Sequence, residues 1–239
     1  MKTTLPFRGA LFDLDGVITS TDTQHFAAWK RMFEQDAGVE EFSRNDYLEH
    51  VDGKKRLDGV TSLLSAKELH YSLEKAKQLG EMKQRYYLEE IDRGGITVFT
   101  STVDLIHQLT DHGVTHAVVS SSRNAKHILE RTRLDGLFEV IIGGEHVITR
   151  DKEVIVELAG KPAPDLFLRA TQELGLAPHE VIGFEDALSG IEALLKAAIF
   201  SVAIDRKNSL KLQSSGADML VTDLSEVTIE RLVDSFRKK

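Results

Sequence analysis

Short apolar runs and segments with helically spaced apolar residues alternate along the chain. The run Gly9–Phe12 predicts a buried strand. From Thr23 onward the pattern becomes helical, with Phe26 and Phe33 on one face, and Thr23 or the preceding Asp22 could serve as N-cap. Between about residues 40 and 90 the helical spacing continues without a strand-like run, which predicts an all-helical insert.

The second half of the chain alternates regularly between the two patterns. Strands are predicted at 116–120, 138–142, 180–184, 200–204 and 218–222, and helices through 105–109 and at 124–134, 163–174, 187–197 and 225–236. This alternation predicts an α/β fold with a doubly wound, Rossmann-like parallel sheet. The predicted domains are a core of residues 1–20 and 91–239 and a helical bundle of residues 21–90, inserted after the first strand.

Two acidic clusters follow predicted strands. Asp13 and Asp15 lie in FDLDG, and Glu185 and Asp186 follow the apolar run at 181–184. Each cluster alone has an ordinary explanation, a D-G turn or acids that cap a helix. Ligands of open α/β sheets bind beyond the carboxyl ends of strands. Clustered carboxylates repel unless a cation or a proton intervenes, and Mg²⁺ prefers hard oxygen ligands, so the combination predicts a Mg²⁺ site.

Four other positions carry candidate chemistry. Ser120–Ser122 precedes a predicted helix and could bind an anion or simply cap the helix. Lys161 in GKPAPD is stiffened by two prolines, which favours a positioned cation over a solvated side chain. His25 follows the first acid pair and could be functional or merely packed. Arg56, in the glycine-punctuated VDGKKRLDGV, could belong to a binding loop or a solvated one.

Composition excludes several classes of function. The 30 basic and 38 acidic residues give a net charge of −8 without a long basic run, so we expect no nucleic-acid partner. The chain has no Cys, which excludes disulfides, thiolate metal sites and cysteine nucleophiles. No signal peptide or membrane-length apolar stretch is apparent. We therefore expect a cytoplasmic protein without a membrane partner.

The ordered motifs FDLDGV, VVSSSRN, GKPAPD and GFEDALSG resemble the haloacid dehalogenase (HAD) superfamily, over residues from about 8 to 225. More narrowly, TDTQHFAAWK and VDGKKRLDGV are similar to the β-phosphoglucomutase-like subfamily. The resemblance implies that the helical insert is a mobile cap. The chain departs from the family at Ser20, usually Asp, and at Phe99–Thr102, where relatives usually have Pro-Gly. The segment Val147–Gly160 is longer than expected and could form a hairpin or an enlarged flap.

The resemblance also implies a role for each motif residue. Asp13 would be the nucleophile that forms an aspartyl-phosphate, and Asp15 the general acid/base. Mg²⁺ would be bound by Asp13, Asp15, Glu185 and Asp186. Ser120 and Lys161 would bind the phosphoryl group. The implied substrate-binding residues are His25, Gly53, Arg56, Lys83, Ser121, Ser122 and Asn124.

The function expected from this resemblance is a phosphosugar mutase. It would interconvert β-glucose 1-phosphate and glucose 6-phosphate through glucose 1,6-bisphosphate, as a monomer that binds a small phosphorylated sugar. The alternative is a phosphatase that uses the same Asp13 chemistry on a phosphate monoester. Basic residues around Arg56 favour the mutase, because a mutase must hold a second phosphate. A catalytically silent binding protein is disfavoured, since every motif acid and Lys161 are present.

Overall fold

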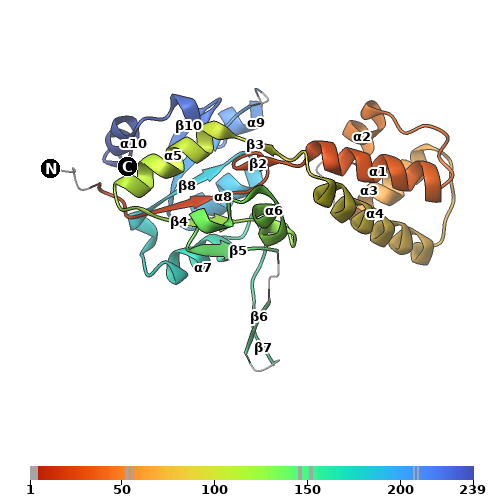
Figure 1. Cartoon of the computed structure of the whole chain (residues 1–239), viewed down its shortest axis with the longest axis horizontal. Helices are drawn as coiled ribbons and strands as arrows, with labels where there is room; N and C mark the ends of the chain where they lie inside the picture. The colour runs from red at the N-terminus through yellow and green to blue at the C-terminus, as the bar shows by residue number, and fades with distance from the viewer. Residues whose placement is uncertain are drawn as a thin grey trace. The chain divides into compact units, whose positions relative to one another are not determined.

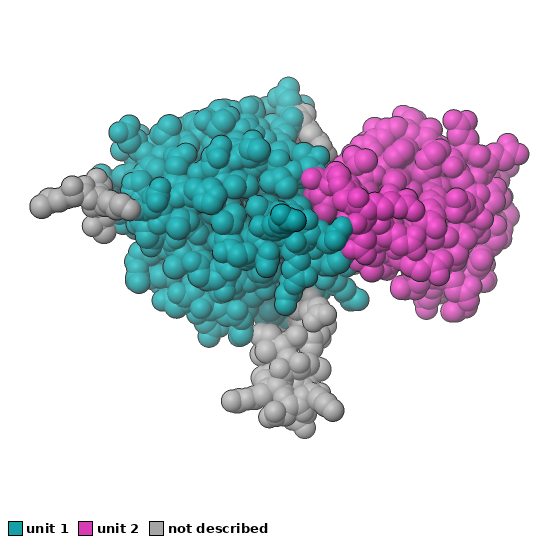
Figure 2. Space-filling model, in the orientation of Figure 1, with its two compact units in different colours: residues 1–20, 97–239 teal, residues 21–96 magenta. Residues whose placement is uncertain are grey.

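The computed structural model describes residues 5–51, 54, 56–144, 147–150, 153–206, 208 and 210–239 (Figure 1). The chain divides into two compact units, residues 1–20 with 97–239 (unit 1) and residues 21–96 (unit 2) (Figure 2). The boundary expected at residue 90 falls inside helix α4 (Leu73–Arg93), so the helical unit ends later, at Ile96. No helix in the described part of the chain has the length and apolar character needed to span a membrane.

Unit 1 is built on a six-stranded parallel sheet with the strand order β10-β9-β8-β1-β4-β5. The strands are β1 (Gly9–Phe12), β4 (Thr115–Val119), β5 (Val140–Ile142), β8 (Val181–Glu185), β9 (Phe200–Ile204) and β10 (Met219–Val221). Because β1 pairs with both β4 and β8, the crevice beyond its carboxyl end is the place where this kind of sheet binds ligands. The predicted α/β fold class is confirmed.

Helices flank this sheet, with α5 and α7 on opposite sides of it in Figure 1. They are α5 (Thr100–Asp111), α6 (Ala125–Thr132), α7 (Asp165–Glu173), α8 (Leu188–Lys196), α9 (Leu210–Gln213) and α10 (Ile229–Phe236), with 3-10 turns η1 (Asp135–Leu137), η2 (Pro178–Glu180) and η3 (Leu224–Glu226). The central strand β1 is fully buried, and Phe12 stacks on Phe184 of β8 with ring centroids 4.6 Å apart. Burial on both faces explains why such strands are continuous apolar runs.

Two short antiparallel pairs complete the strands. β2 (Thr19–Ser20) pairs with β3 (Thr97–Val98), where the chain leaves and re-enters unit 1. Each of these strands has only two residues, so no alternation of apolar and polar residues could predict it from the sequence. β6 (Val147–Arg150) pairs with β7 (Glu153–Glu157), so the long segment before Lys161 contains a hairpin, one of the two predicted alternatives.

Unit 2 contains the helices α1 (Asp22–Asp36), α2 (Arg44–His50), α3 (Arg56–Ala66) and α4. Helix α1 begins at Asp22 with Thr21 as the N-cap residue, so neither of the predicted capping residues stands at the cap. Phe33 is buried on the inner face of α1, whereas Phe26 is only half-buried. The predicted substrate residue Gly53 lies outside the described residues.

Candidate active site

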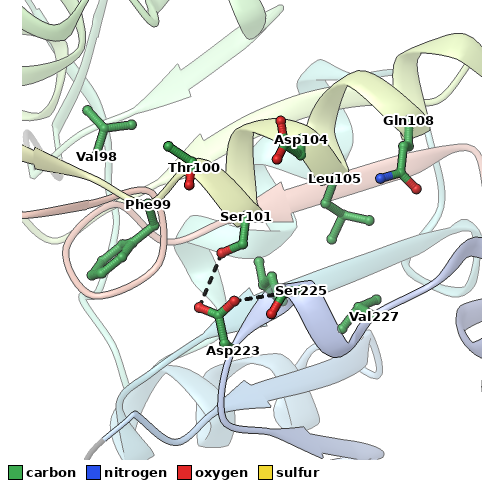
Figure 3. A pocket seen from close by; sticks show the side chains of 11 residues that line it. Val98, Phe99, Thr100, Ser101, Asp104, Leu105, Gln108, Asp223, Ser225 and Val227 are labelled. Atoms are coloured by element: carbon green, nitrogen blue, oxygen red, sulfur yellow. Dashed lines mark hydrogen bonds between the residues drawn. The ribbon is translucent and has the colours of Figure 1, made fainter.

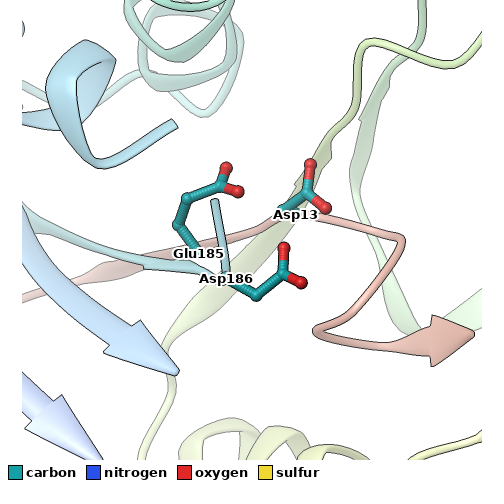
Figure 4. A group of neighbouring side chains, drawn as sticks. All are labelled: Asp13, Glu185 and Asp186. Carbon is teal, nitrogen blue, oxygen red and sulfur yellow. The ribbon is translucent and has the colours of Figure 1, made fainter. Parts of the chain in front are cut away.

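Three carboxylates from two strand ends converge beyond the sheet. Asp13 directly follows β1, Glu185 ends β8, and Asp186 is the next residue. One ligand oxygen from each lies within 4.8 Å of the others (Figure 4). The backbone explains this proximity, because the Asp13 N–H donates to the carbonyl oxygen of Phe184 at 3.0 Å and so extends the β1–β8 pairing. The structure thus brings Asp13 of the first acidic cluster together with both acids of the second.

Lys161 is buried against two of these acids. Its Nζ donates to Asp13 Oδ1 at 2.5 Å, to Glu185 Oε2 at 2.7 Å and to the Val119 carbonyl oxygen at 2.9 Å. The side chain is only 6% exposed. Burial lowers the pKa of Lys161, but the carboxylates of Asp13 and Glu185 outweigh burial and leave this pKa raised. Lys161 is therefore a positioned cation, as predicted.

Glu185 is the most deeply buried of the three acids. Burial and, to a smaller extent, the negative charge of Asp13 raise its pKa to about 8, although the Lys161 ammonium acts in the opposite direction. The Ala187 N–H donates to Glu185 Oε1 at 3.1 Å. With all three acids ionised, a single lysine leaves an excess of negative charge that a divalent cation would offset.

Two glycines make room for the carboxylates. A Cβ at Gly190 would lie 2.0 Å from Glu185 Oε2, and a Cβ at Gly16 would lie 1.9 Å from Asp186 Oδ2. Gly16 also has φ +91°, a conformation that favours glycine. Closely spaced carboxylate oxygens suit Mg²⁺, which prefers hard oxygen ligands, so the residues present fit that ion.

Asp15 and the serines surround this cluster. Asp15 is exposed whereas Asp13 is buried, so the two side chains diverge beyond the strand. Ser120 is buried at the end of β4, and its Oγ accepts from the Ser122 N–H at 3.1 Å. This contact holds the loop before α6 but does not cap that helix, whose N-cap residue is Asn124. A hydroxyl that accepts still has its own proton to donate, so Ser120 retains a donor for an anion.

The remaining serine-loop residues lie just beyond Ser120. Ser122 is half-buried and its Oγ accepts from the Asn124 N–H at 3.2 Å. Asn124 is the N-cap residue of α6, without a side-chain capping bond to that helix. Ser121 is exposed. All three predicted substrate residues therefore follow β4, on the loop that also carries Ser120.

Within unit 2, the half-buried His25 lies against the buried Lys83. Lys83 Nζ lies 2.7 Å from His25 Nδ1, and the His25 ring stacks on Tyr87 at 4.1 Å between centroids. Burial lowers the pKa of Lys83 to about 7, and the positive charge of Arg56 contributes. Burial also lowers the pKa of His25, with Lys83 and Arg56 contributing. In this structure His25 has the packed environment that the sequence left as an alternative.

Arg56 is held by helix α4. It is the first residue of α3, and its guanidinium donates to Gln84 Oε1 at 2.8 Å and to Glu81 Oε1 at 3.4 Å. Its neighbour Lys54 donates to the Ser62 hydroxyl at 2.8 Å. Lys54 is thus engaged within its own segment, and Arg56 is oriented by Gln84 and Glu81 of α4, two partners that no sequence pattern indicated.

Two further features were not predicted. Arg206, in the polar loop after β9, donates from Nε to the Gly16 carbonyl oxygen at 3.2 Å. A cavity of about 490 Å³ lies between the start of α5 and η3 (Figure 3). Its polar lining includes Ser101, Asp104 and Asp223. No motif marks either feature, because both depend on contacts between segments far apart in sequence.

Comparison with known proteins supports the reading of the motifs. The chain is 36% identical to the β-phosphoglucomutase of Mycobacterium bovis, over 92% of this chain and 91% of that protein. It is 30% identical to the β-phosphoglucomutase of Bacillus subtilis, over 97% and 96% of the two chains. It is also 27% identical to a phosphorylated carbohydrates phosphatase of Thermotoga maritima, over 88% and 92%.

A solved structure shows the same fold. The β-phosphoglucomutase of Clostridium difficile superposes with a TM-score of 0.74 at 24% identity, covering 97% of this chain and 98% of that one. The family model for haloacid dehalogenase-like hydrolases matches residues 7–198. This range contains all four motifs and every carboxylate of the cluster. The chain therefore belongs to the haloacid dehalogenase-like hydrolase family.

Proposed function

We propose that this chain is a Mg²⁺-dependent phosphosugar mutase that uses Asp13 as its nucleophile and interconverts β-glucose 1-phosphate and glucose 6-phosphate. The observation that carries the proposal is the position of the Asp13 carboxylate. It lies beside the Lys161 ammonium and within 4.8 Å of Glu185 and Asp186. Phosphoryl transfer needs mainly positioning and charge stabilisation, and this cluster supplies both.

In the first half-reaction, a carboxylate oxygen of Asp13 forms a bond to phosphorus while the bond from phosphorus to the sugar oxygen breaks. Asp15 donates a proton to that leaving oxygen. Lys161 and the Ser120 hydroxyl donate hydrogen bonds to the transferring group. In the second half, another sugar hydroxyl attacks the aspartyl-phosphate while Asp15 takes its proton, which frees Asp13.

Asp13, Glu185, Asp186 and the backbone carbonyl of Asp15 would hold the Mg²⁺. When bound, the ion offsets the negative charge of the acids and of the phosphoryl group. The Lys161 ammonium lies 2.5 Å from Asp13 Oδ1, where it would offset negative charge beside the nucleophile.

A mutase is favoured over a phosphatase by two observations. The relatives at 36% and 30% identity are named β-phosphoglucomutases. Unit 2 also presents an arginine, Arg56, whose guanidinium is aligned by Gln84 and which could hold the second phosphate of a bisphosphate. The alternative is hydrolysis of a sugar phosphate, in which water replaces the sugar hydroxyl as the acceptor of the phosphoryl group from Asp13. The name of the Thermotoga relative, a phosphorylated carbohydrates phosphatase, describes this activity.

The test is incubation with β-glucose 1-phosphate, Mg²⁺ and a trace of glucose 1,6-bisphosphate, followed by NMR of the products. Accumulation of glucose 6-phosphate supports the mutase, whereas free glucose with inorganic phosphate supports the phosphatase. The Asp13→Asn variant serves as the blank. A wild-type chain that leaves the substrate untouched, or an equally active Asp13→Asn variant, would refute the assignment of Asp13.

A further inference from the structure

One guanidinium joins three segments of unit 1 that are far apart in sequence. Arg206 Nε donates to the carbonyl oxygen of Gly16 at 3.2 Å, and Nη1 forms an ion pair with the carboxylate of Asp223. The Arg206 Cζ lies 3.9 Å from the ring centroid of Phe99. Arg206 therefore contacts the loop after β1, the turn after β10 and the residue that follows β3.

The loop that Arg206 reaches carries Asp15. It is closed by three backbone bonds, from Gly16 N to Thr19 O at 2.7 Å and from Ile18 N and Thr19 N to Leu14 O, each at 2.9 Å. Gly16 also packs so closely on Asp186 that a Cβ could not be accommodated. A rotation of the Gly16 peptide would thus displace Asp15 on one side and change the space for Asp186 on the other.

The other contacts of Arg206 are themselves fixed. Asp223 accepts from the Ser225 N–H at 2.9 Å and from the Ser101 hydroxyl at 3.2 Å (Figure 3). The Phe99 N–H donates to the Ile18 carbonyl oxygen at 2.9 Å, which links the start of α5 to the same loop. Arg206 therefore connects the Asp15 loop to a rigid frame made by α5 and η3.

The burial of this arginine is costly. Its side chain is 21% exposed, and among the described residues its Nη2 is buried without a hydrogen-bond partner. A buried donor that lacks a partner destabilises the folded state. A lysine could make one or two of the same contacts, but it lacks the planar fork that lies on the Phe99 ring while donating in two directions.

We propose that Arg206 is a positioning residue that fixes the Gly16 peptide and thereby holds Asp15 in its place for proton transfer. The inference rests on the proposed function only for the role of Asp15; the restraint on the loop stands on geometry alone. The hydrogen bonds of Arg206 go to Gly16 and Asp223 and not to Asp13 or Lys161, so within the described residues it acts through the loop.

Two measurements on Arg206→Lys test the proposal. In the metal-free full chain, the amides of Gly16, Ile18 and Thr19 are expected to exchange with deuterium at least about ten-fold faster, while amides of β4 keep their rates. In the enzyme with Mg²⁺, kcat is expected to fall at least about ten-fold with KM within about two-fold, because a misplaced acid/base affects the chemical step. Arg231→Lys is the matched control, since Arg231 donates to the Glu226 carbonyl oxygen at 2.9 Å and is exposed.

Each outcome is decisive. Unchanged exchange of the three loop amides overturns the proposal whatever the activity. Faster exchange with wild-type kcat shows a structural contact only and also overturns the catalytic role. If the wild-type chain transfers no phosphoryl group, the proposed function fails separately, and the exchange result still decides the loop restraint. Should Arg206→Lys not fold, Asp223→Asn releases the other end of the guanidinium and is expected to speed exchange of the same amides; unchanged rates would overturn the inference.

Discussion

Replacing Lys83 with methionine should make the chain more stable at neutral pH. Lys83 is 4% exposed, and its Nζ lies within hydrogen-bond distance of His25 Nδ1, at 2.7 Å. No ion pair of Lys83 with an acid occurs in the part of the chain that the structure describes. Burial lowers its pKa from 10.5 to about 7, with a contribution from the charge of Arg56. A charge that is destabilised inside the folded state lowers the free energy of unfolding.

The sign and size follow from proton linkage. The pKa of Lys83 is about 7 in the folded state and 10.5 as the reference for the unfolded state, so between these values the unfolded chain binds more protons. Wild-type stability should therefore rise with pH, by about 2 kcal/mol between pH 7 and pH 9 for the full shift. Nζ also lies 4.7 Å from the Tyr87 centroid and 5.2 Å from the Trp29 centroid. These contacts favour the charged form, which reduces the expected rise to about 1–2 kcal/mol.

Lys83→Met should abolish this rise. His25 interferes little, because burial lowers its pKa well below the usual value of 6.5 in the folded state and an unfolded histidine is already mostly neutral at pH 7. The assay is guanidinium unfolding at pH 7 and pH 9, followed by the fluorescence of Trp29, the single tryptophan, which lies in unit 2. Lys77→Met, on the exposed face of α4, is the control and should keep the wild-type increment. An equal increment in wild type and Lys83→Met would refute the reasoning.

Three other substitutions test the site. Asp13→Asn should form no acid-stable phosphoenzyme by intact mass while keeping the wild-type melting temperature; a phosphorylated variant would contradict the role of Asp13. Arg56→Ala should lower mutase kcat/KM about 100-fold but aryl-phosphate hydrolysis less than about 3-fold, because only the mutase must hold a second phosphate; equal losses would argue against this role. Gly190→Ala should cost about 1–3 kcal/mol in denaturant unfolding and weaken Mg²⁺ binding in calorimetry, because its Cβ would collide with Glu185. Gly136→Ala, with open space at its Cβ, should change neither.

The architecture of unit 1 was predictable because its strands are buried on both faces. Leu11, Val118 and Ile182 are fully buried in three adjacent strands, and such strands form apolar runs that stand out from the helical segments. The two-residue strands β2 and β3 were not predictable, because their pairing depends on the two chain crossings between the units. Unit 2 ends at Ile96 rather than at residue 90, because helix α4 continues past residue 90 to Arg93.

The acids of the site were predictable, but most of their partners were not. Asp13 and Glu185 stand at the ends of recognisable strands, so parallel pairing alone brings them together. Lys161 reaches Asp13 from 148 positions away, and only the prolines around it suggested a fixed position. Arg206 reaches Gly16 from 190 positions away and carries no such signal. In the same way, no pattern on α4 marks Gln84 as the residue that orients Arg56.

The glycines of the motifs explain why acids and glycines occur together in them. Gly16 belongs to the first motif, yet the carboxylate that fills the space of its missing Cβ is Asp186 of the last motif. In the same way, the carboxylate of Glu185 occupies the space that a Cβ at Gly190 would fill, and both residues belong to the last motif. A side chain at either glycine would push a carboxylate away from the cluster while leaving the strands intact. The two motifs are therefore sterically interdependent, and a sequence that kept all the acids but replaced either glycine would keep the fold and lose the close approach of the three carboxylates.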